Sequence, residues 1–263
     1  EIMDESPDMQ DKENALDIKS FKGDVQFSHV NFSYEKEASI LKDITFQVKA
    51  GEKVALVGPT GSGKTTIINL LMRFYDIDSG SIQIDGVNIQ NYKISQLREK
   101  IGIVLQDTFL FSGTIMENIR YGRLNASDEE VVAAAKMASA HSFIKHLPDQ
   151  YETIITSGGS SLSQGQRQLL AIARVILADS DILILDEATS SIDTKTEIEI
   201  QRGLNRLSEG RTSFVIAHRL KTIENADRIL VIHHGTLIES GTHQELLQKK
   251  GFYSDLYESQ FNI

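Results

Sequence analysis

The chain has 263 residues, 40% of them hydrophobic, which is enough to bury the core of one large domain or two small ones. It contains no cysteine, so a disulfide framework and a thiolate metal site are excluded. The formal net charge of −10 disfavours a nucleic-acid partner, because an acidic surface repels a polyphosphate backbone. The sequence has no apolar run long enough to cross a bilayer and no evident signal peptide. Because it begins at Glu1 and not at methionine, we expect a fragment of a longer protein.

The first part of the chain changes from a polar tail to a strand pattern. Residues 1–20 are polar and acidic, and we expect them to be a linker that precedes the folded domain. Residues 24–31 and 38–49 alternate apolar and polar side chains, which predicts two strands with one exposed face each. Tyr34 lies between them, just before a polar turn. Its ring is therefore expected near the surface, where its face could take a nucleotide base.

Residues 58–65 fit the phosphate-binding pattern G-x-x-x-x-G-K-[ST]. The apolar stretch 53–57 predicts a buried strand before them, and residues 66–72 predict a helix after them, which is the setting that this loop requires. Glycine lets backbone N–H groups close around an anion at the helix N-terminus. Lys64 adds a positive charge for the β- and γ-phosphates, and the Thr65 hydroxyl can bind Mg²⁺. The residues that we assign to nucleotide binding here are Gly58, Pro59, Thr60, Gly61, Ser62, Gly63, Lys64, Thr65 and Thr66.

The next elements lead to a second polar strand end. Residues 81–84 predict a short strand, and residues 94–100 predict a short helix. Residues 101–105 form an apolar run that predicts another buried strand, and Gln106 follows it. Ligands of open α/β sheets bind at the carboxyl ends of the strands, so Gln106 is a candidate for ligand contact. An ordinary loop glutamine fits these residues equally well.

Residues 107–160 lose the strand pattern, and we expect them to form a helical insertion without strands. A capping-box sequence at residues 127–130 opens a predicted helix over residues 131–138. A second short helix is expected at residues 142–147, where Pro148 stops it.

A polar turn precedes the most amphipathic stretch of the chain. The turn holds Ser163, Gly165 and Gln166, and the helix is predicted over residues 167–178. The positive end of a helix dipole attracts anions, so this turn is a candidate for a second anion site. A plain helix cap is the alternative reading of the same residues.

Residues 181–187 form a continuous apolar strand that ends in two acids, Asp186 and Glu187. Carboxylates at the end of a buried strand are costly unless they bind something. In a protein with a phosphate-binding loop, the first acid holds Mg²⁺ and the second can deprotonate the attacking water. Exposed acids that cap the next turn are the alternative.

The rest of the chain continues the alternation of helices and strands. A helix is predicted over residues 194–208 and a strand over residues 211–217, directly before His218. A histidine at that strand end fits a catalytic role and a structural role about equally. A hairpin over residues 228–240 and a capping box at residues 242–245 precede a helical C-terminal region.

Taken in order, these features resemble the nucleotide-binding domain of ABC transporters over residues 21–263. The match rests on Tyr34, the phosphate-binding loop, Gln106, the Leu-Ser-Gln-Gly-Gln run at residues 162–166, residues 182–187, residues 190–193 and His218. Residues 107–115, the Leu-Ser-Gln-Gly-Gln-Arg-Gln run and residues 251–256 resemble an exporter half-transporter. Residues 1–20 resemble the linker that follows the last membrane helix of such proteins.

The resemblance implies an α/β fold: a P-loop NTPase (RecA-like) core with an N-terminal antiparallel β subdomain and an inserted α-helical subdomain at about residues 107–170. It implies an ATPase that uses ATP and Mg²⁺ and powers export from the cytoplasmic face of the cell membrane. The implied partners are a second such domain, identical or not, and the transmembrane domain of the same transporter. A soluble ABC-type ATPase or an importer subunit is the alternative.

The resemblance also assigns roles residue by residue. Tyr34 stacks on adenine, and Gln106 contacts Mg²⁺ or water and senses the membrane domain. Asp186 holds Mg²⁺, Glu187 is the general base, and His218 contacts the γ-phosphate. Ser163, Gly165 and Gln166 grip the γ-phosphate of ATP on the other subunit, so that two domains enclose two ATP molecules head to tail.

Three positions depart from the commonest family pattern. Gln164 stands where glycine is commoner, and Ser191-Ile192 replaces Ala-Leu. Residues 157–160 lack the glutamate that many exporters place before the signature turn. Such departures resemble the catalytically complete subunit of a heterodimeric bacterial exporter.

Overall fold

The computed structural model describes residues 9–35, 38–105, 108–159, 161–187, 192–217 and 220–261. Near the N-terminus it contains an antiparallel sheet in the order β2-β1-β4-β5. These strands are β1 (Val25–Ser33), β2 (Ser39–Val48), β4 (Ser79–Ile84) and β5 (Val87–Asn88). Buried and exposed positions alternate along most of β2, as the sequence pattern predicts for a strand with one solvent face.

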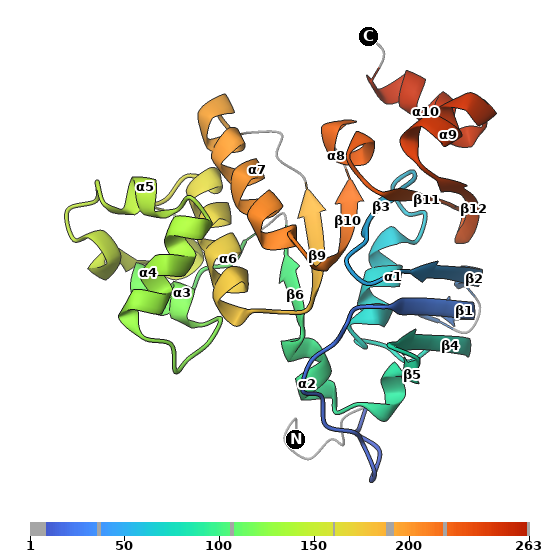
Figure 1. The fold of residues 1–263 in the computed structure, drawn as a ribbon, viewed down its shortest axis with the longest axis horizontal. Coiled ribbons are helices and arrows are strands. Elements are labelled where there is room, and N and C mark those ends of the chain that lie inside the picture. The colour runs from blue at the N-terminus through green and yellow to red at the C-terminus, as the bar shows by residue number, and fades with distance from the viewer. Residues whose placement is uncertain are drawn as a thin grey trace.

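A second, six-stranded sheet has the order β12-β11-β3-β10-β9-β6. Five of its strands run parallel: β3 (Lys53–Val57), β6 (Ile101–Val104), β9 (Ile182–Glu187), β10 (Thr212–Ala217) and β11 (Arg228–His233). The edge strand β12 (Thr236–Gly241) pairs with β11 as a hairpin. Strands β3, β6, β9 and β10 begin within one residue of the predicted starts, and β11 begins where the predicted hairpin begins, at residue 228. The parallel strands point their carboxyl ends to the same side of the molecule (Figure 1).

The parallel strands have apolar centres because each of them separates two cores. In β3, Val54 and Leu56 lie in a core shared with the antiparallel sheet and with α1 (Lys64–Leu71). Ala55 and Val57 face the other core, which is built mainly by helices. A strand covered on both faces has no exposed position, so its sequence reads as a continuous run and not as an alternation.

The helical part lies to one side of the sheets (Figure 1) and contains α3 (Ile115–Arg120), α4 (Asp128–Met137), α5 (His141–Ile144) and α6 (Gln164–Ala178). The expectation of no strand in residues 107–160 is wrong, because β7 (Gly113–Thr114) pairs with β8 (Ile154–Ile155). Two-residue strands are too short to show a period-two pattern. Helix α6 begins three residues before the predicted start, because the polar turn forms its first turn.

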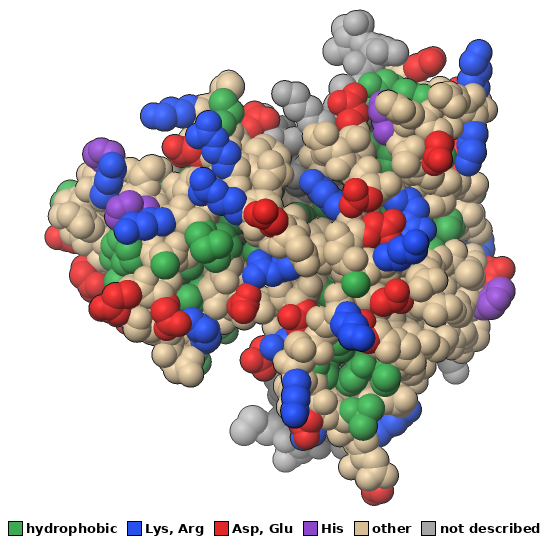
Figure 2. Space-filling view, in the orientation of Figure 1, with side chains coloured by type: hydrophobic (Ala, Val, Ile, Leu, Met, Phe, Trp, Pro, Cys, Tyr) green, Lys and Arg blue, Asp and Glu red, His purple; other side chains and the backbone are tan. Residues whose placement is uncertain are grey.

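The remaining helices contribute side chains to the two cores described above. They are α2 (Ile94–Glu99), α7 (Thr194–Ser208), α8 (Leu220–Glu224), α9 (His243–Lys249) and α10 (Phe252–Phe261), with short 3₁₀ turns at η2 (Ile89–Asn91), η3 (Gln150–Glu152) and η4 (Ser157–Gly159). Within the described ranges, no helix combines the length and apolar character needed to cross a membrane. On the face shown in Figure 2, acidic and basic side chains are interspersed and do not separate by sign.

The predicted fold class is confirmed: a parallel α/β core carries an antiparallel sheet at its N-terminal side and a helical insertion. Because β3, β10, β9 and β6 are neighbours in this order, their carboxyl ends lie side by side along one edge. In the sequence, the phosphate-binding loop follows β3, Gln106 and His218 come after β6 and β10, and the two acids end β9.

Candidate nucleotide-binding site

The phosphate-binding loop joins β3 to α1 in a conformation that needs glycine. Gly58 has φ 153° and Gly63, the N-cap of α1, has φ 110°. A Cβ on Gly58 would lie 2.0 Å from the carbonyl oxygen of Ile232 on β11. The loop therefore depends on backbone freedom and on the absence of a side chain where it passes the neighbouring strand.

Lys64 is buried at the first residue of α1, and its Nζ folds back over the loop. It donates to the carbonyl oxygens of Gly58 at 2.7 Å and Pro59 at 2.9 Å. Burial lowers the pKa of this ammonium group, while the charge of Asp186 opposes the shift. The lysine is thus held at the concave side of the loop, in electrostatic reach of the acid at the end of β9.

Ser62 gives a test of whether the loop fits an anion. Its Oγ is buried and has no hydrogen-bond partner among the described residues. Its backbone is held from behind, since Gly235 N, in the β11–β12 turn, donates to Ser62 O at 3.0 Å. Thr60, Gly61 and Thr65 are exposed at the rim. A buried unsatisfied hydroxyl beside a glycine cradle and a lysine fits bound phosphate.

The acidic end of β9 lies next to β10 in register, with Asp186 opposite Ile216 and Glu187 opposite Ala217. Asp186 is partly buried. The backbone of Glu187 closes β9, but its side chain lies outside the described part of the chain. Gln106 and His218, which follow β6 and β10 in the sequence, also lie outside the described residues. Within the described ranges, no group of three or more acidic or histidine side chains could hold a metal by itself.

Tyr34 stands beside the second turn of α1. Its hydroxyl lies 3.3 Å from Thr66 Oγ1 and accepts a hydrogen bond from Asn69 Nδ2 at 3.3 Å. Phe32 and Tyr75 each contact its ring edge-to-face, with centroids 4.9 Å and 5.0 Å away. The ring remains 47% exposed. It is therefore a fixed aromatic surface on the same helix that begins with Lys64.

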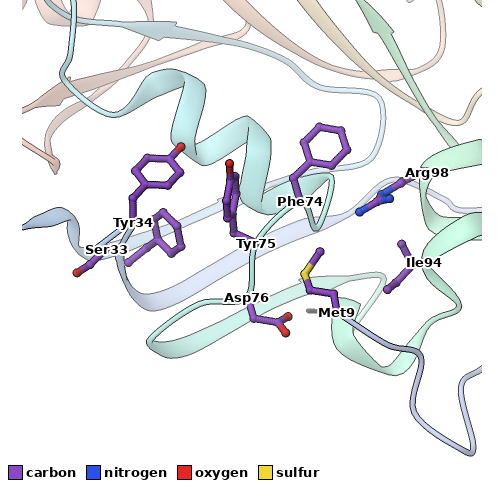
Figure 3. A pocket seen from close by; sticks show the side chains of 9 residues that line it. Met9, Ser33, Tyr34, Phe74, Tyr75, Asp76, Ile94 and Arg98 are labelled. Atoms are coloured by element: carbon purple, nitrogen blue, oxygen red, sulfur yellow. The ribbon is translucent and has the colours of Figure 1, made fainter. Parts of the chain in front are cut away.

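These rings border an open pocket of about 580 Å³. Figure 3 shows Tyr34 and Tyr75 on one side of it, with Phe74 and Arg98 on the other. A pocket of this size accommodates a small molecule.

The start of α6 is a complete capping box. Ser163 Oγ accepts from Gln166 N at 3.2 Å, and Ser163 N donates to Gln166 Oε1 at 3.0 Å. Gly165 is packed against α7, because a Cβ there would lie 2.3 Å from Thr196 Cγ2. Among the described residues, no hydrogen bond joins Ser163, Gly165 or Gln166 to the phosphate-binding loop. The structure thus places Tyr34 beside the helix that begins with Lys64, and Lys64 within the electrostatic influence of Asp186, while the described α6 start makes no hydrogen bond to the loop.

Three residues of the site were not predicted from sequence. Asn69 orients Tyr34, Tyr75 packs on its ring, and Gly235 supports the loop from behind. Asn69 lies one helical turn after Thr66, so helical spacing could have placed it on the Tyr34 side. The contact of Gly235 joins residues far apart in sequence and left no local signal.

Comparisons with known proteins identify relatives of this chain. The family model described as "ABC transporter" matches residues 41–190. The uncharacterized ABC transporter ATP-binding protein YfiC of Bacillus subtilis is 56% identical over 261 residues, which cover 99% of this chain and 43% of that protein. A putative multidrug export ATP-binding/permease protein of Staphylococcus aureus is 50% identical over 261 residues, covering 99% of this chain and 45% of that protein.

The fold matches a solved structure over the same range. The structure of a bacterial Atm1-family ABC exporter with ATP bound superposes with a TM-score of 0.93 at 43% identity, covering 99% of this chain and 46% of that one. The chain therefore spans less than half the length of these relatives.

Proposed function

This chain belongs to the ABC transporter family, as an ATP-binding domain, and we propose that it hydrolyses ATP to power export across a membrane. The observation that carries the proposal is the glycine-rich loop with its unsatisfied Ser62 Oγ and its buried Lys64, whose charge interacts with that of Asp186. The relatives named for multidrug export and the exporter structure support the export role. We place the domain at the cytoplasmic face of the cell membrane.

The proposed catalysis rests on positioning and charge. Tyr34 stacks on the adenine, while the loop N–H groups and Lys64 hold the phosphates. Thr65, Gln106 and Asp186 would hold Mg²⁺, which would supply positive charge beside the phosphate oxygens. Glu187 takes the proton of the attacking water, and His218 stabilises the γ-phosphate.

The separate start of α6 supports a site completed by a second subunit. Ser163, Gly165 and Gln166 present a helix N-terminus that makes no hydrogen bond to the chain's own phosphate loop among the described residues. We infer that it grips the γ-phosphate bound to another copy or to a related domain. Two domains then enclose two ATP molecules, and hydrolysis separates them.

An exposed aromatic surface fits a membrane-domain partner. Phe109, Phe111 and Tyr121 form a ring cluster, with 57%, 40% and 56% of their surfaces exposed. Arg174 fixes the cluster from below: its Nε donates to Asn118 O at 2.9 Å, and its guanidinium lies 5.6 Å from two of the rings. Rigid exposed aromatics beside a guanidinium are typical of binding surfaces. We propose that the transmembrane domain docks here and that residues 1–20 link to it.

Substitution of the proposed base tests the enzyme assignment. We expect Glu187→Gln to retain ATP binding and to lower hydrolysis at least about a hundredfold, because a general base contributes that much or more. The variant is also expected to accumulate an ATP-bound dimer, measurable by size-exclusion chromatography with light scattering. Glu209→Gln, at an exposed position after α7, is the matched control. Unchanged turnover in Glu187→Gln would refute the role of Glu187.

A further inference from the structure

The segment before the first strand is tied to the domain along its length. Residues 9–21, which we call the strap, run beside η2 and α2 (Figure 1). Leu16 N donates to Asn91 O at 2.7 Å, and Lys93 N donates to Leu16 O at 3.2 Å. Farther along, Ile18 N donates to Gln96 Oε1 at 2.6 Å. Although the strap is mostly exposed, it is docked by backbone hydrogen bonds.

Acidic side chains add to this docking. Asp11 Oδ1 accepts from Ile94 N at 2.8 Å, at the first residue of α2. Asp17 forms an ion pair with Lys93 at 2.7 Å and accepts from Gln96 Nε2 at 2.9 Å. Hydrogen bonds and the charge of Lys93 lower the pKa of Asp17.

One buried arginine joins the strap to the phosphate-binding helix. Arg73 follows the C-cap of α1, has φ 51° and is only 3% exposed. Its Nη2 donates to Gln10 O of the strap at 3.3 Å, and its Nη1 donates to Tyr92 O at 3.3 Å. Its Nε lies 3.6 Å from Asp76 Oδ1. A buried guanidinium is costly without acceptors. The docked strap supplies one of these acceptors, the carbonyl oxygen of Gln10, so undocking of the strap would leave Arg73 short of a partner.

Arg98 holds the same helix end from the other side. Its Nη2 donates to Arg73 O at 2.7 Å and its Nε to Met72 O at 3.2 Å, which caps the carbonyl end of α1 with positive charge. Figure 3 shows Met9 of the strap bordering the same pocket as Phe74 and Arg98. The strap therefore lies against the cap of the helix whose other end is the phosphate loop.

We propose that strap docking and nucleotide binding at the phosphate loop stabilise each other, with Arg73 as the positioning residue between them. Helix α1 has eight residues, about 12 Å of rise, and transmits a shift of its cap to Lys64 as one unit. A docked strap fixes Arg73, and a fixed Arg73 keeps the loop in its binding position. The inference rests on the proposed function for its ligand, a nucleoside diphosphate or triphosphate.

The test measures ADP affinity of the full chain by calorimetry. Arg73→Met is expected to weaken ADP binding about fivefold or more, and Arg73→Lys to recover only part of the loss, because a lysine cannot serve both carbonyls. Arg211→Met is the matched control, since Arg211 caps α7 with a bond to Leu207 O at 2.8 Å, away from the phosphate loop.

A second variant keeps the test independent of the buried arginine. Asp11→Ala combined with Asp17→Ala removes exposed side chains only, so the fold is retained, and it is expected to weaken ADP binding in the same direction. Glu13→Ala lies on the same exposed segment and makes none of the contacts above, so it serves as its control.

Linkage supplies a readout that a structural role would not give. If docking of the strap raises the affinity for nucleotide, bound nucleotide must raise the equilibrium constant for strap docking by the same factor. Saturating ADP is expected to slow hydrogen exchange at the amides of Leu16 and Ile18 about fivefold. The inference is overturned if Arg73→Met and the double variant of Asp11 and Asp17 both bind ADP as tightly as the wild type. It is also overturned if ADP leaves hydrogen exchange at these amides unchanged. Failure of the wild type to bind ADP at all overturns the proposed function itself and, with it, this inference.

Discussion

Lys64 shows how the phosphate-binding loop holds a buried positive charge. Its ammonium group is buried, and it is tolerated because two loop carbonyls accept its protons at 2.7 Å and 2.9 Å. The same position is the one from which it can reach bound phosphate. The loop's own oxygens therefore offset the cost of burying the charge, and we expect bound phosphate oxygens to take their place.

We expect Lys64→Ala to weaken ATP binding about 10- to 100-fold, since a hydrogen bond to a charged group is worth about 1.5–3 kcal/mol. Calorimetric titration with ATP checks this, and Lys49→Ala, an exposed lysine before β3, is the control. If Lys64→Ala bound ATP with the affinity of the wild type, the proposed role of Lys64 in nucleotide binding would be refuted.

At the residue scale, the sequence predicted the loop but not its supports. Lys64 and Tyr34 could be assigned because a local pattern or a strand boundary marks them. Asn69 and Gly235 could not be assigned, because their contacts with Tyr34 and Ser62 depend on how distant segments pack.

At the scale of elements, helix capping accounts for several boundaries. Helices α4 and α9 both begin with the capping boxes that the sequence predicted, at Ser127 and Thr242. Strand β3 and helix α7 have the predicted bounds because their apolar patterns are long and end sharply. Helix α6 was predicted too short, because its polar first turn carries no apolar period.

The capping box of α9 gives a pH-dependent contribution to stability. Hydrogen bonding to Thr242 lowers the pKa of Glu245 below its ordinary value of 4.5. The folded state therefore favours the ionised form, and this stabilisation is present above pH 4.5 and lost as the pH falls through the lower folded pKa. Glu245→Gln cannot titrate. We expect the difference in melting temperature between wild type and this variant to shrink steadily below pH 4.5, and a constant difference would contradict the assignment.

At the scale of the molecule, two surfaces support our proposal that other domains complete this one. The α6 start has no nucleotide partner within its own described chain, and the ring cluster of Phe109, Phe111 and Tyr121 is left open to solvent. The sequence indicated a second ATP-binding domain and a transmembrane domain as partners only through family resemblance. Composition and periodicity do not reveal a surface that a partner covers.

We expect substitution of the ring cluster to leave ATP binding intact but to impair the coupling of this domain to transport. Tyr121→Ser with Phe109→Ser leaves the ATP affinity of this chain within about twofold of wild type, because neither side chain belongs to the nucleotide site. In the intact transporter, loss of two exposed aromatic contacts at about 2 kcal/mol each is expected to lower transport activity at least about tenfold. Ile238→Ser, an exposed apolar residue on β12, is the control. Full transport by the double variant would exclude this surface as the docking site.

The capping box at the start of α6 has a consequence for the sign of its ligand. Within the box, Ser163 Oγ serves as an acceptor, so the single hydroxyl proton takes no part in it. Gln166 contributes Oε1, so its two amide hydrogens take no part either. The box thus uses one lone pair on each side-chain oxygen and the two backbone N–H groups, and it leaves the side-chain hydrogens of Ser163 and Gln166 unused. These unused hydrogens and the positive end of the helix dipole together favour an anionic ligand over a cation at the start of α6.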